Sequence, residues 1–111
     1  MPACSELVNL LRELTGAGEA ITEKAMFGGL AFLLDGNLAF AASGQGGLLV
    51  RVDPELTDAH AARPHASIAV MRGRPMRGWV RVAAEGVRGK RQLRPWVHES
   101  LAYVRTLPPK R

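Results

Sequence analysis

Residues suited to metal or nucleophilic chemistry are few in this 111-residue sequence. A zinc or iron site needs several cysteine or imidazole ligands that converge on one point. The candidates are Cys4, His60, His65 and His98, and no Cys–Cys pair accompanies them because Cys4 is the only cysteine. We expect His60 on a short helix and His65 beyond its end, so the two need not face each other. The sequence therefore predicts no metal site.

Nucleophilic catalysis requires a serine or cysteine that a neighbouring base activates. Ser43 begins the stretch Ser-Gly-Gln-Gly-Gly, which lacks the Gly-x-Ser-x-Gly pattern of a nucleophile elbow and precedes a predicted strand. Cys4 stands next to Ser5, the predicted cap of the first helix, and an incidental or buried thiol accounts for it. We therefore predict no catalytic nucleophile.

Glycines and carboxylates also have structural explanations. The run 44–47 lacks the Gly-Lys-Ser/Thr ending of a phosphate-binding loop and lies between two predicted strands. Asp53, Glu55 and Asp58 surround one predicted helix start, where negative charge favours the positive end of the helix dipole. The sequence thus predicts no bound cofactor and no enzyme, with a small enzyme of unrecognised site as the remotest alternative.

The remaining chemical candidates are basic. Residues 1–62 hold three Lys or Arg against eight acids, a net −5, whereas residues 63–111 hold twelve against two, a net +10. Arginine suits bidentate contacts with phosphates, and Trp79 and Trp96 could stack on bases if they were exposed. Two interpretations stay open: arginines on solvated faces, or a surface for nucleic acid or an acidic partner. The candidate contact residues are Arg72, Arg74, Arg77, Arg88, Lys90, Arg91 and Arg94.

The first half of the chain predicts one helix and three strands. Residues 5–16 place Leu7, Leu10, Leu11 and Leu14 on one helical stripe, with Ser5 as cap. Residues 17–29 are expected to be a connector. Residues 30–34 and 37–42 form strands joined by a two-residue turn, and residues 48–52 form the third strand. In this register Leu33 lies opposite Leu38, and Ala31 opposite Phe40.

The second half predicts two more strands between two helices. Asp53 and Pro54 start a short helix, and residues 67–71 and 79–83 are strands joined by a loop over 72–78. The final helix begins near Gln92, because Pro95 fits only a first turn. Short connections favour antiparallel pairing. We therefore expect one α+β domain over residues 1–111, with an antiparallel sheet of about five strands and helices packed on one face.

Composition places the chain among proteins of reducing compartments. Its apolar fraction of 47% suits a packed core, and a lone cysteine allows no intrachain disulfide. No secretory signal opens the sequence, and no apolar run reaches the ~20 residues that a membrane-spanning helix needs. These features predict a cytoplasmic protein without a membrane contact.

One stretch resembles a known family. Met26-Phe27-Gly28-Gly29, an apolar strand, Asp35-Gly36 and a second apolar strand are similar to the amino-terminal domain of the TfoX/Sxy competence-regulator family. The resemblance extends over about residues 5 to 107. It implies an α+β fold and a non-enzymatic regulatory or interaction role in bacteria. Full-length competence regulators carry a second, carboxy-terminal domain, which we do not expect here, so a competence role is not assumed.

The motif itself admits two interpretations. Met26 and Phe27 can fill a sheet-to-helix junction while Gly28 and Gly29 permit close backbone approach, which makes the motif mainly structural. Alternatively, the glycines form a ligand loop. For the whole domain we expect a protein partner or a homo-oligomer, since an open sheet leaves edges that a second copy can pair. A nucleic-acid-binding module that uses the basic second half is the alternative.

Overall fold

A computed structural model describes residues 2–15, 21–26, 29–43 and 46–109, and for residues 2–6 it describes only the backbone. Within these residues the chain forms a helix, four strands, a short helical segment, two strands and a final helix. The elements are α1 (Pro2–Thr15), β1 (Ile21–Met26), β2 (Gly29–Leu34), β3 (Asn37–Ala42), β4 (Leu48–Arg51), η1 (Pro54–Leu56), α2 (Thr57–Ala61), β5 (Ala66–Met71), β6 (Arg74–Val82), η2 (Ala84–Gly86) and α3 (Lys90–Val104).

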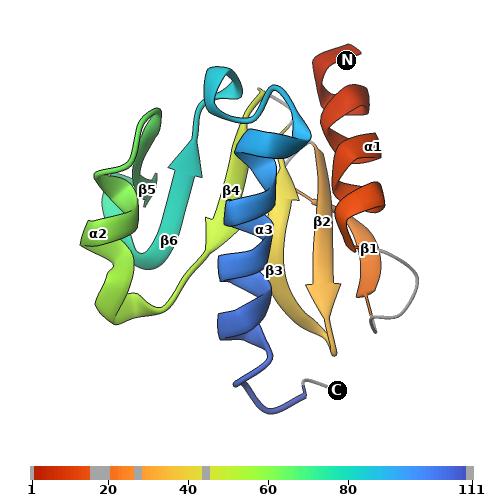
Figure 1. Ribbon diagram of the computed structural model, residues 1–111. Coiled ribbons are helices and arrows are strands. Elements are labelled where there is room, and N and C mark those ends of the chain that lie inside the picture. Colours follow the sequence, from red (N-terminus) through yellow and green to blue (C-terminus); the bar gives the residue numbers. More distant parts are fainter. Residues whose placement is uncertain (1, 16–20, 27–28, 44–45, 110–111) are drawn as a thin grey trace.

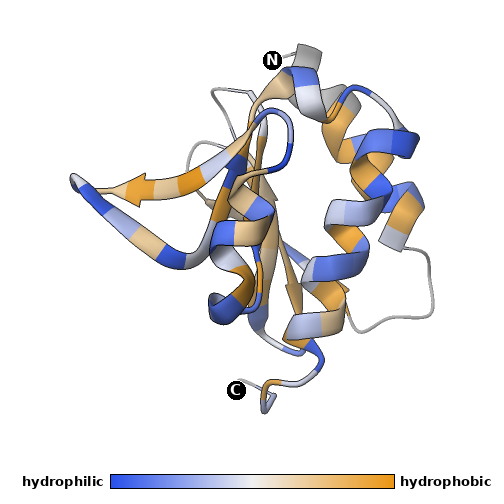
Figure 2. Cartoon of the chain, turned by 60° about the vertical axis from the view of Figure 1, so that its left-hand side comes forward, coloured by the Kyte–Doolittle hydropathy of each residue, from blue (hydrophilic) through white to orange (hydrophobic). Residues whose placement is uncertain are grey.

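The strands form one antiparallel sheet in the order β1-β2-β3-β4-β6-β5. Helices α1 and α3 lie in front of its centre, and α2 lies in front of β6 and β5 (Figure 1). The β5–β6 hairpin curls away from the helices and projects from the rest of the molecule (Figure 2). The predicted α+β class, with an antiparallel sheet and helices on one side, is confirmed.

The core lies between the sheet and α1 and α3. The rings of Phe32 and Phe40 stack with their centroids 5.2 Å apart on neighbouring strands, and Leu11, Leu93 and Val104 from the helices are buried against them. Alternation along the strands supplies the apolar face that the helices cover. Aliphatic side chains make up most of the core.

The sheet has six strands where about five were expected, because part of the predicted connector over 17–29 is β1. This strand is hard to recognise in the sequence. Only Ile21 and Met26, at its two ends, are even partly buried. Its four central residues are exposed, so no apolar alternation marks it as a strand. Pairing with β2, from Ile21 opposite Leu34 to Met26 opposite Gly29, is what makes it extended.

The predicted pairing of β2 with β3 is half correct. Leu33 lies opposite Leu38, as expected, but Ala31 lies opposite Ala41, and Phe40 faces Phe32. The register shifts between Phe32 and Leu33 because β3 carries one extra residue, Ala39, at a bulge. The shift puts both phenylalanines on the helix-covered face, where their rings stack.

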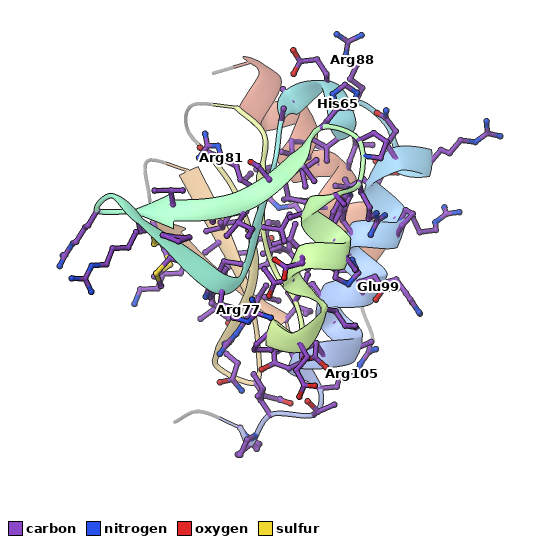
Figure 3. All side chains as sticks on the ribbon, turned by 90° about the vertical axis from the view of Figure 1, so that its left-hand side faces the viewer. His65, Arg77, Arg81, Arg88, Glu99 and Arg105 are labelled. Carbon is purple, nitrogen blue, oxygen red and sulfur yellow. The ribbon has the colours of Figure 1, made fainter. Side chains whose placement is uncertain are left out.

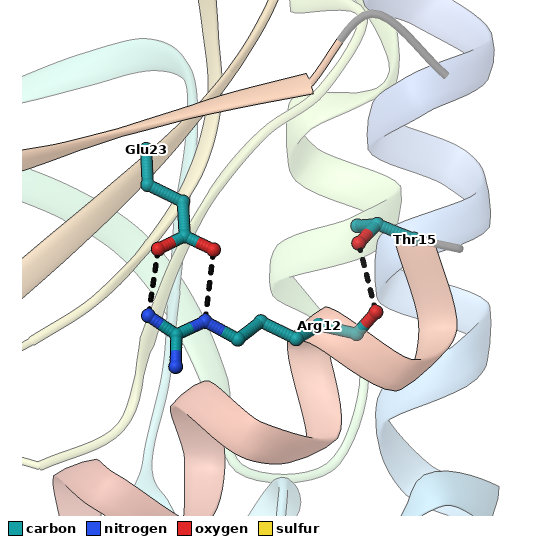
Figure 4. Close-up of polar contacts among 3 residues, drawn as sticks. All are labelled: Arg12, Thr15 and Glu23. Atoms are coloured by element: carbon teal, nitrogen blue, oxygen red, sulfur yellow. Dashed lines mark hydrogen bonds and ion pairs between the residues drawn. The ribbon is translucent and has the colours of Figure 1, made fainter. Parts of the chain in front are cut away.

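Helix α1 begins earlier than predicted and is tied to the edge strand. It starts at Pro2, so Ser5 lies within the helix and is not its cap, because proline is accommodated in a first helical turn. Gly16, the last residue of the predicted helix, lies outside the described residues. Near the helix end Arg12 makes two hydrogen bonds to Glu23 of β1, and the Thr15 hydroxyl donates to the Arg12 carbonyl (Figure 4).

The predicted loop over 72–78 is wrong, because these residues belong to a tight hairpin. β5 ends at Met71, and β6 starts at Arg74 after a two-residue turn. Arg72 and Gly73 occupy that turn with φ of +52° and +77°, which matches the turn type that suits the twist of a hairpin. Pro75 is tolerated in β6 because this part of the strand extends beyond β4.

Helix α3 begins at Lys90, two residues before the predicted start, and Pro95 lies inside it. Gly89 is the extended residue before the helix, and the Gln92 side chain accepts a hydrogen bond from the Arg88 amide at 2.9 Å. The start predicted from Pro95 was too late, since a proline this close to the amino-terminal end removes only one intrahelical hydrogen bond.

Two buried hydroxyls fasten helical segments to strands. The Ser100 hydroxyl of α3 donates to the Ala39 carbonyl at 2.7 Å, at the β3 bulge. The Thr57 hydroxyl donates to the Pro54 carbonyl at 2.7 Å and accepts from the Gly78 amide at 2.8 Å, which joins α2 to β6. Asp53 caps η1 as predicted, its side chain accepting from the Glu55 amide at 3.0 Å.

None of the described helices combines the length and the apolar character that crossing a membrane requires.

Candidate interaction surfaces

The most exposed basic feature is the end of the β5–β6 hairpin, residues 70–77, which we call the arm. It consists of two strands and the turn at Arg72 and Gly73, with Met71 paired to Arg74 and Val70 to Pro75. The arm projects from the side of the sheet that faces away from the helices (Figures 2 and 3). Its residues are therefore in contact with solvent on most sides.

The arginines of the arm differ in their partners. Arg72 and Arg74 are exposed, and no carboxylate of the described residues forms an ion pair with either of them. Arg77 lies farther from the tip, where its Nη1 is 3.7 Å from Asp58 Oδ2 of α2. Residues 59–84 contain no Asp or Glu at all. The positive potential of the arm is thus least neutralised at its tip.

The other four basic candidates lie elsewhere. Arg88, Lys90, Arg91 and Arg94 surround the start of α3, and Figure 3 shows Arg88 at the top of the molecule, far from Arg77 in its lower half. Lys90 forms an ion pair with Glu13 of α1 at 2.5 Å. The structure therefore divides the predicted set into two separate groups, one on the arm and one at α3.

The helix-free face of the sheet is hollowed beside the arm. Ala41, Leu49 and Arg81 lie side by side across β3, β4 and β6, and with three residues of β5 they line a pocket of about 210 Å³. The β5 residues are Ala69, Val70 and Met71. The curl of the hairpin creates this pocket, and its lining is mainly apolar apart from Arg81 and Ser43.

The two edges of the sheet have opposite character. Edge strand β5 carries no charged residue in its six positions, and Val70 is 62% exposed, the most exposed large hydrophobic side chain described. Edge strand β1 carries Glu23 and Lys24 at its centre, both exposed. Natural sheets protect edges with charges, so β1 is protected whereas β5 is not.

Histidines were candidates for a metal site, and one of them does meet an acid. His60 Nε2 lies 3.8 Å from Glu99 Oε2, beside a pocket of about 280 Å³ that Asp53 and Tyr103 also line. The imidazole centroid is 6.0 Å from the Trp96 ring. This pair joins α2 to α3, and no serine or cysteine is among the pocket's lining residues.

The other histidines do not join it. His65 is exposed with φ of +66°, beyond the end of α2 as predicted, and His98 lines a groove between α1 and α3. Within the part of the chain that the structure describes, no group of three or more His, Cys, Asp or Glu is arranged to hold a metal ion. The side chain of Cys4 lies outside that part.

Both tryptophans pack within the domain. Trp96 is almost fully buried, and the Arg63 guanidinium lies 3.8 Å from its ring centroid. Trp79 is half-buried, and the Arg51 guanidinium lies 5.4 Å from its ring centroid and 6.0 Å from that of Tyr103. These cation–π contacts use arginine to cover aromatic faces, which makes neither ring an open stacking platform.

The described residues of the family motif lie at strand ends and in one turn. Met26 is the last residue of β1, where it pairs with Gly29 of β2; Phe27 and Gly28 lie outside the described residues. Asp35 and Gly36 form the β2–β3 turn with φ of +51° and +83°, as predicted. Sequence reasoning missed the arm itself, although Arg72-Gly73 directly after an apolar run was a usable turn signal.

Comparison with known proteins agrees with this architecture. The family model described as the TfoX N-terminal domain matches residues 12–104, which is most of the chain. Searches of curated proteins and of solved structures returned no match. The matched region runs from the last turn of α1 through the end of α3 and so includes all six strands. The chain therefore belongs to the TfoX N-terminal domain family.

Proposed function

We propose that this domain is a non-catalytic interaction module of regulatory type, which pairs with a second copy of itself through the β5 edge. Membership of the TfoX N-terminal domain family supports the regulatory role. The single observation that carries the mode of action is the uncharged, exposed edge strand Ala66–Met71.

An edge strand offers backbone donors and acceptors that a second strand can satisfy. β5 pairs with β6 on one side, and it is the last strand in the order of the sheet. Figure 3 views the molecule from this edge, with β5 in front. An antiparallel pair of β5 strands would satisfy the free backbone groups of both copies. The exposed Val70 side chain would lose solvent contact in the same step.

A second copy suits β5 better than it suits β1. Two β1 strands paired about a twofold axis would, in the central registers, place Glu23 opposite the copy's Glu23 or Lys24 opposite its Lys24. Like charges directly opposite each other destabilise a strand pair. No register of β5 brings two charges together within residues 66–71, because that strand has none. A twofold arrangement also closes the assembly at a dimer.

The test is the oligomeric state of a β5 variant. We expect the wild-type domain to sediment as a dimer at micromolar concentration, and Val70→Lys to sediment as a monomer, because charged side chains on edge strands prevent pairing. Leu56→Lys is the matched control, since Leu56 is the other exposed large hydrophobic residue among those described, 47% exposed and outside the sheet. This variant should remain a dimer.

Two outcomes would overturn the proposal. A wild-type domain that remains monomeric at hundreds of micromolar would exclude self-association at useful concentrations. A dimer that Val70→Lys leaves intact would place the contact elsewhere. Circular dichroism should show both lysine variants folded, because substitutions of exposed side chains usually change stability by less than about 0.5 kcal/mol.

We also propose a cytoplasmic location. The sequence has a single cysteine and so no intrachain disulfide, which suits a reducing compartment. Labelling the Cys4 thiol in intact cells with membrane-permeant and membrane-impermeant reagents would distinguish this location from an exported one.

A further inference from the structure

We infer that the arm is a DNA-binding element whose tip, at Arg72, Gly73 and Arg74, enters the minor groove of A·T-rich duplex DNA. The inference is independent of self-association through β5, because the tip lies beyond the strand residues that would pair. Its starting point is the placement of two arginines at the end of a projecting two-stranded ribbon.

Charge is the first support. Arg72 and Arg74 are exposed and have no ion-pair partner among the described residues. Asp58, the one acid of the described residues that forms an ion pair with an arginine of the arm, lies 3.7 Å from Arg77 instead. Uncompensated arginines on a projecting element attract a polyanion electrostatically. The arginines at the start of α3 lie on another part of the molecule, where Lys90 is paired with Glu13.

Backbone conformation is the second support. Arg72 has φ of +52° in the first position of the turn, where Asn, Asp or Gly is the usual residue. A left-handed conformation is unfavourable for a long side chain. An arginine at this position costs some stability but places a guanidinium at the apex of the turn. Residues held in unfavourable backbone conformations cluster at functional sites.

Shape selects the groove. The minor groove is about 6 Å wide and narrows further in A·T tracts, where its negative potential attracts inserted arginines. A flat ribbon is too wide for it, but a two-residue turn can enter end-on. Gly73 keeps the apex thin because it has no side chain. The apex is also free of neighbours, since no heavy atom lies within 4 Å of the position of a Cβ added at Gly73. The wide, shallow minor groove of duplex RNA offers no comparable slot.

Apolar side chains adjoin the two arginines. Pro75 and Val70 are exposed and Met71 and Met76 are half-buried on the same arm. Proteins that enter the minor groove often place such side chains against the sugars or between base steps. The arm therefore combines the two kinds of side chain that this mode of binding uses.

The test compares two variants that remove equal charge. Arg72→Asn/Arg74→Gln alters the tip, and Arg88→Gln/Arg91→Gln alters the start of α3. Fluorescence anisotropy would measure the binding of the full chain to labelled A·T-rich and G·C-rich duplexes between 50 and 200 mM salt. We expect A·T-rich DNA to be preferred and a minor-groove ligand such as netropsin to displace the protein.

The tip variant should weaken A·T-rich binding roughly 100-fold, about tenfold for each arginine. It should also reduce the slope of log K against log salt by up to about two. The α3 variant should weaken binding much less. Arg72→Asn alone should raise the melting temperature, because asparagine suits the turn, so lost binding cannot be attributed to unfolding.

Each contrary outcome is informative. Equal losses of DNA affinity in the two double variants would mean non-specific electrostatic attraction and would overturn the proposal. So would equal affinity for G·C-rich DNA, duplex RNA or single strands. Tighter binding to polyglutamate than to DNA would assign the arm to an acidic protein surface instead.

Discussion

Arg12 of α1 and Glu23 of β1 form a bidentate ion pair: the arginine Nε donates to Oε2 at 2.8 Å and Nη2 donates to Oε1 at 2.7 Å (Figure 4). The pair fastens the first helix to the edge strand β1. The hydrogen bonds from Arg12, and secondarily its charge, lower the pKa of Glu23, and the pKa of Arg12 is raised in return.

This pair predicts acid-sensitive stability. The pKa of Glu23 in the folded state lies below its ordinary value of 4.5. At pH values between the folded and the unfolded pKa, the unfolded state therefore binds more protons than the folded state. The free energy of unfolding should therefore decrease as the pH falls from about 4.5 through the folded pKa. Glu23→Gln should lessen this dependence. Urea unfolding between pH 3 and 7 would measure it, with Glu85→Gln, an exposed carboxylate on η2, as control.

Ser100→Ala should destabilise the domain. It removes the buried hydrogen bond from α3 to the Ala39 carbonyl and leaves that carbonyl without its donor. We expect a loss of about 1–3 kcal/mol in the free energy of unfolding, measured by urea denaturation. Ser67→Ala, at an exposed position of β5, should change it by less than about 0.5 kcal/mol. Equal effects would show that Ser100 contributes no more than a surface hydroxyl.

Thr57 should prove sensitive to the loss of its hydroxyl but not of its methyl group. Thr57→Val keeps the shape but leaves the Gly78 amide without its buried acceptor, and we expect a loss of about 2 kcal/mol. Thr57→Ser keeps both hydrogen bonds and should lose less than about 1 kcal/mol. Thermal unfolding of the two variants in parallel would show which loss matters more. If Thr57→Ser lowered the melting temperature more than Thr57→Val, packing of the methyl group would outweigh the hydrogen bonds.

Two glycines with similar positive φ angles should respond differently to alanine. Gly47 and Gly73 have φ of +82° and +77°, but an added Cβ at Gly47 would lie 2.5 Å from the Val82 carbonyl oxygen, whereas Gly73 has open space. Both variants incur the left-handed cost of about 1 kcal/mol. Gly47→Ala should lose at least about 2 kcal/mol more because of the clash. Similar melting temperatures would refute the difference.

Local sequence signals predicted much of the fold. The leucine stripe of α1, the Asp35–Gly36 turn and the cap at Asp53 each depend on neighbouring residues alone. The strand β1 could not be predicted in this way, because its exposed centre has no apolar period and only pairing with β2 makes it extended. The bulge at Ala39 likewise depends on two strands together.

The candidate surfaces were predicted less completely. Composition identified the arginines, but it could not show that Arg72 and Arg74 lie at the end of a ribbon while Arg88 lies elsewhere (Figure 3). The glycines and proline in the stretch 72–78 indicated a loop, although Arg72 and Gly73 alone make the turn. The exposed Val70 became visible only when β5 was found at the edge of the sheet.

The curl of the β5–β6 hairpin restricts how copies of this domain can assemble. A neighbour's flat sheet cannot lie flush against the hollowed face, since the arm stands in its way (Figure 2). Face-to-face stacking of two sheets, as in a β-sandwich, is thereby disfavoured. A dimer can instead form edge to edge, with the strands of both copies in one continuous sheet. The same bend would keep the two tips clear of the joined sheets.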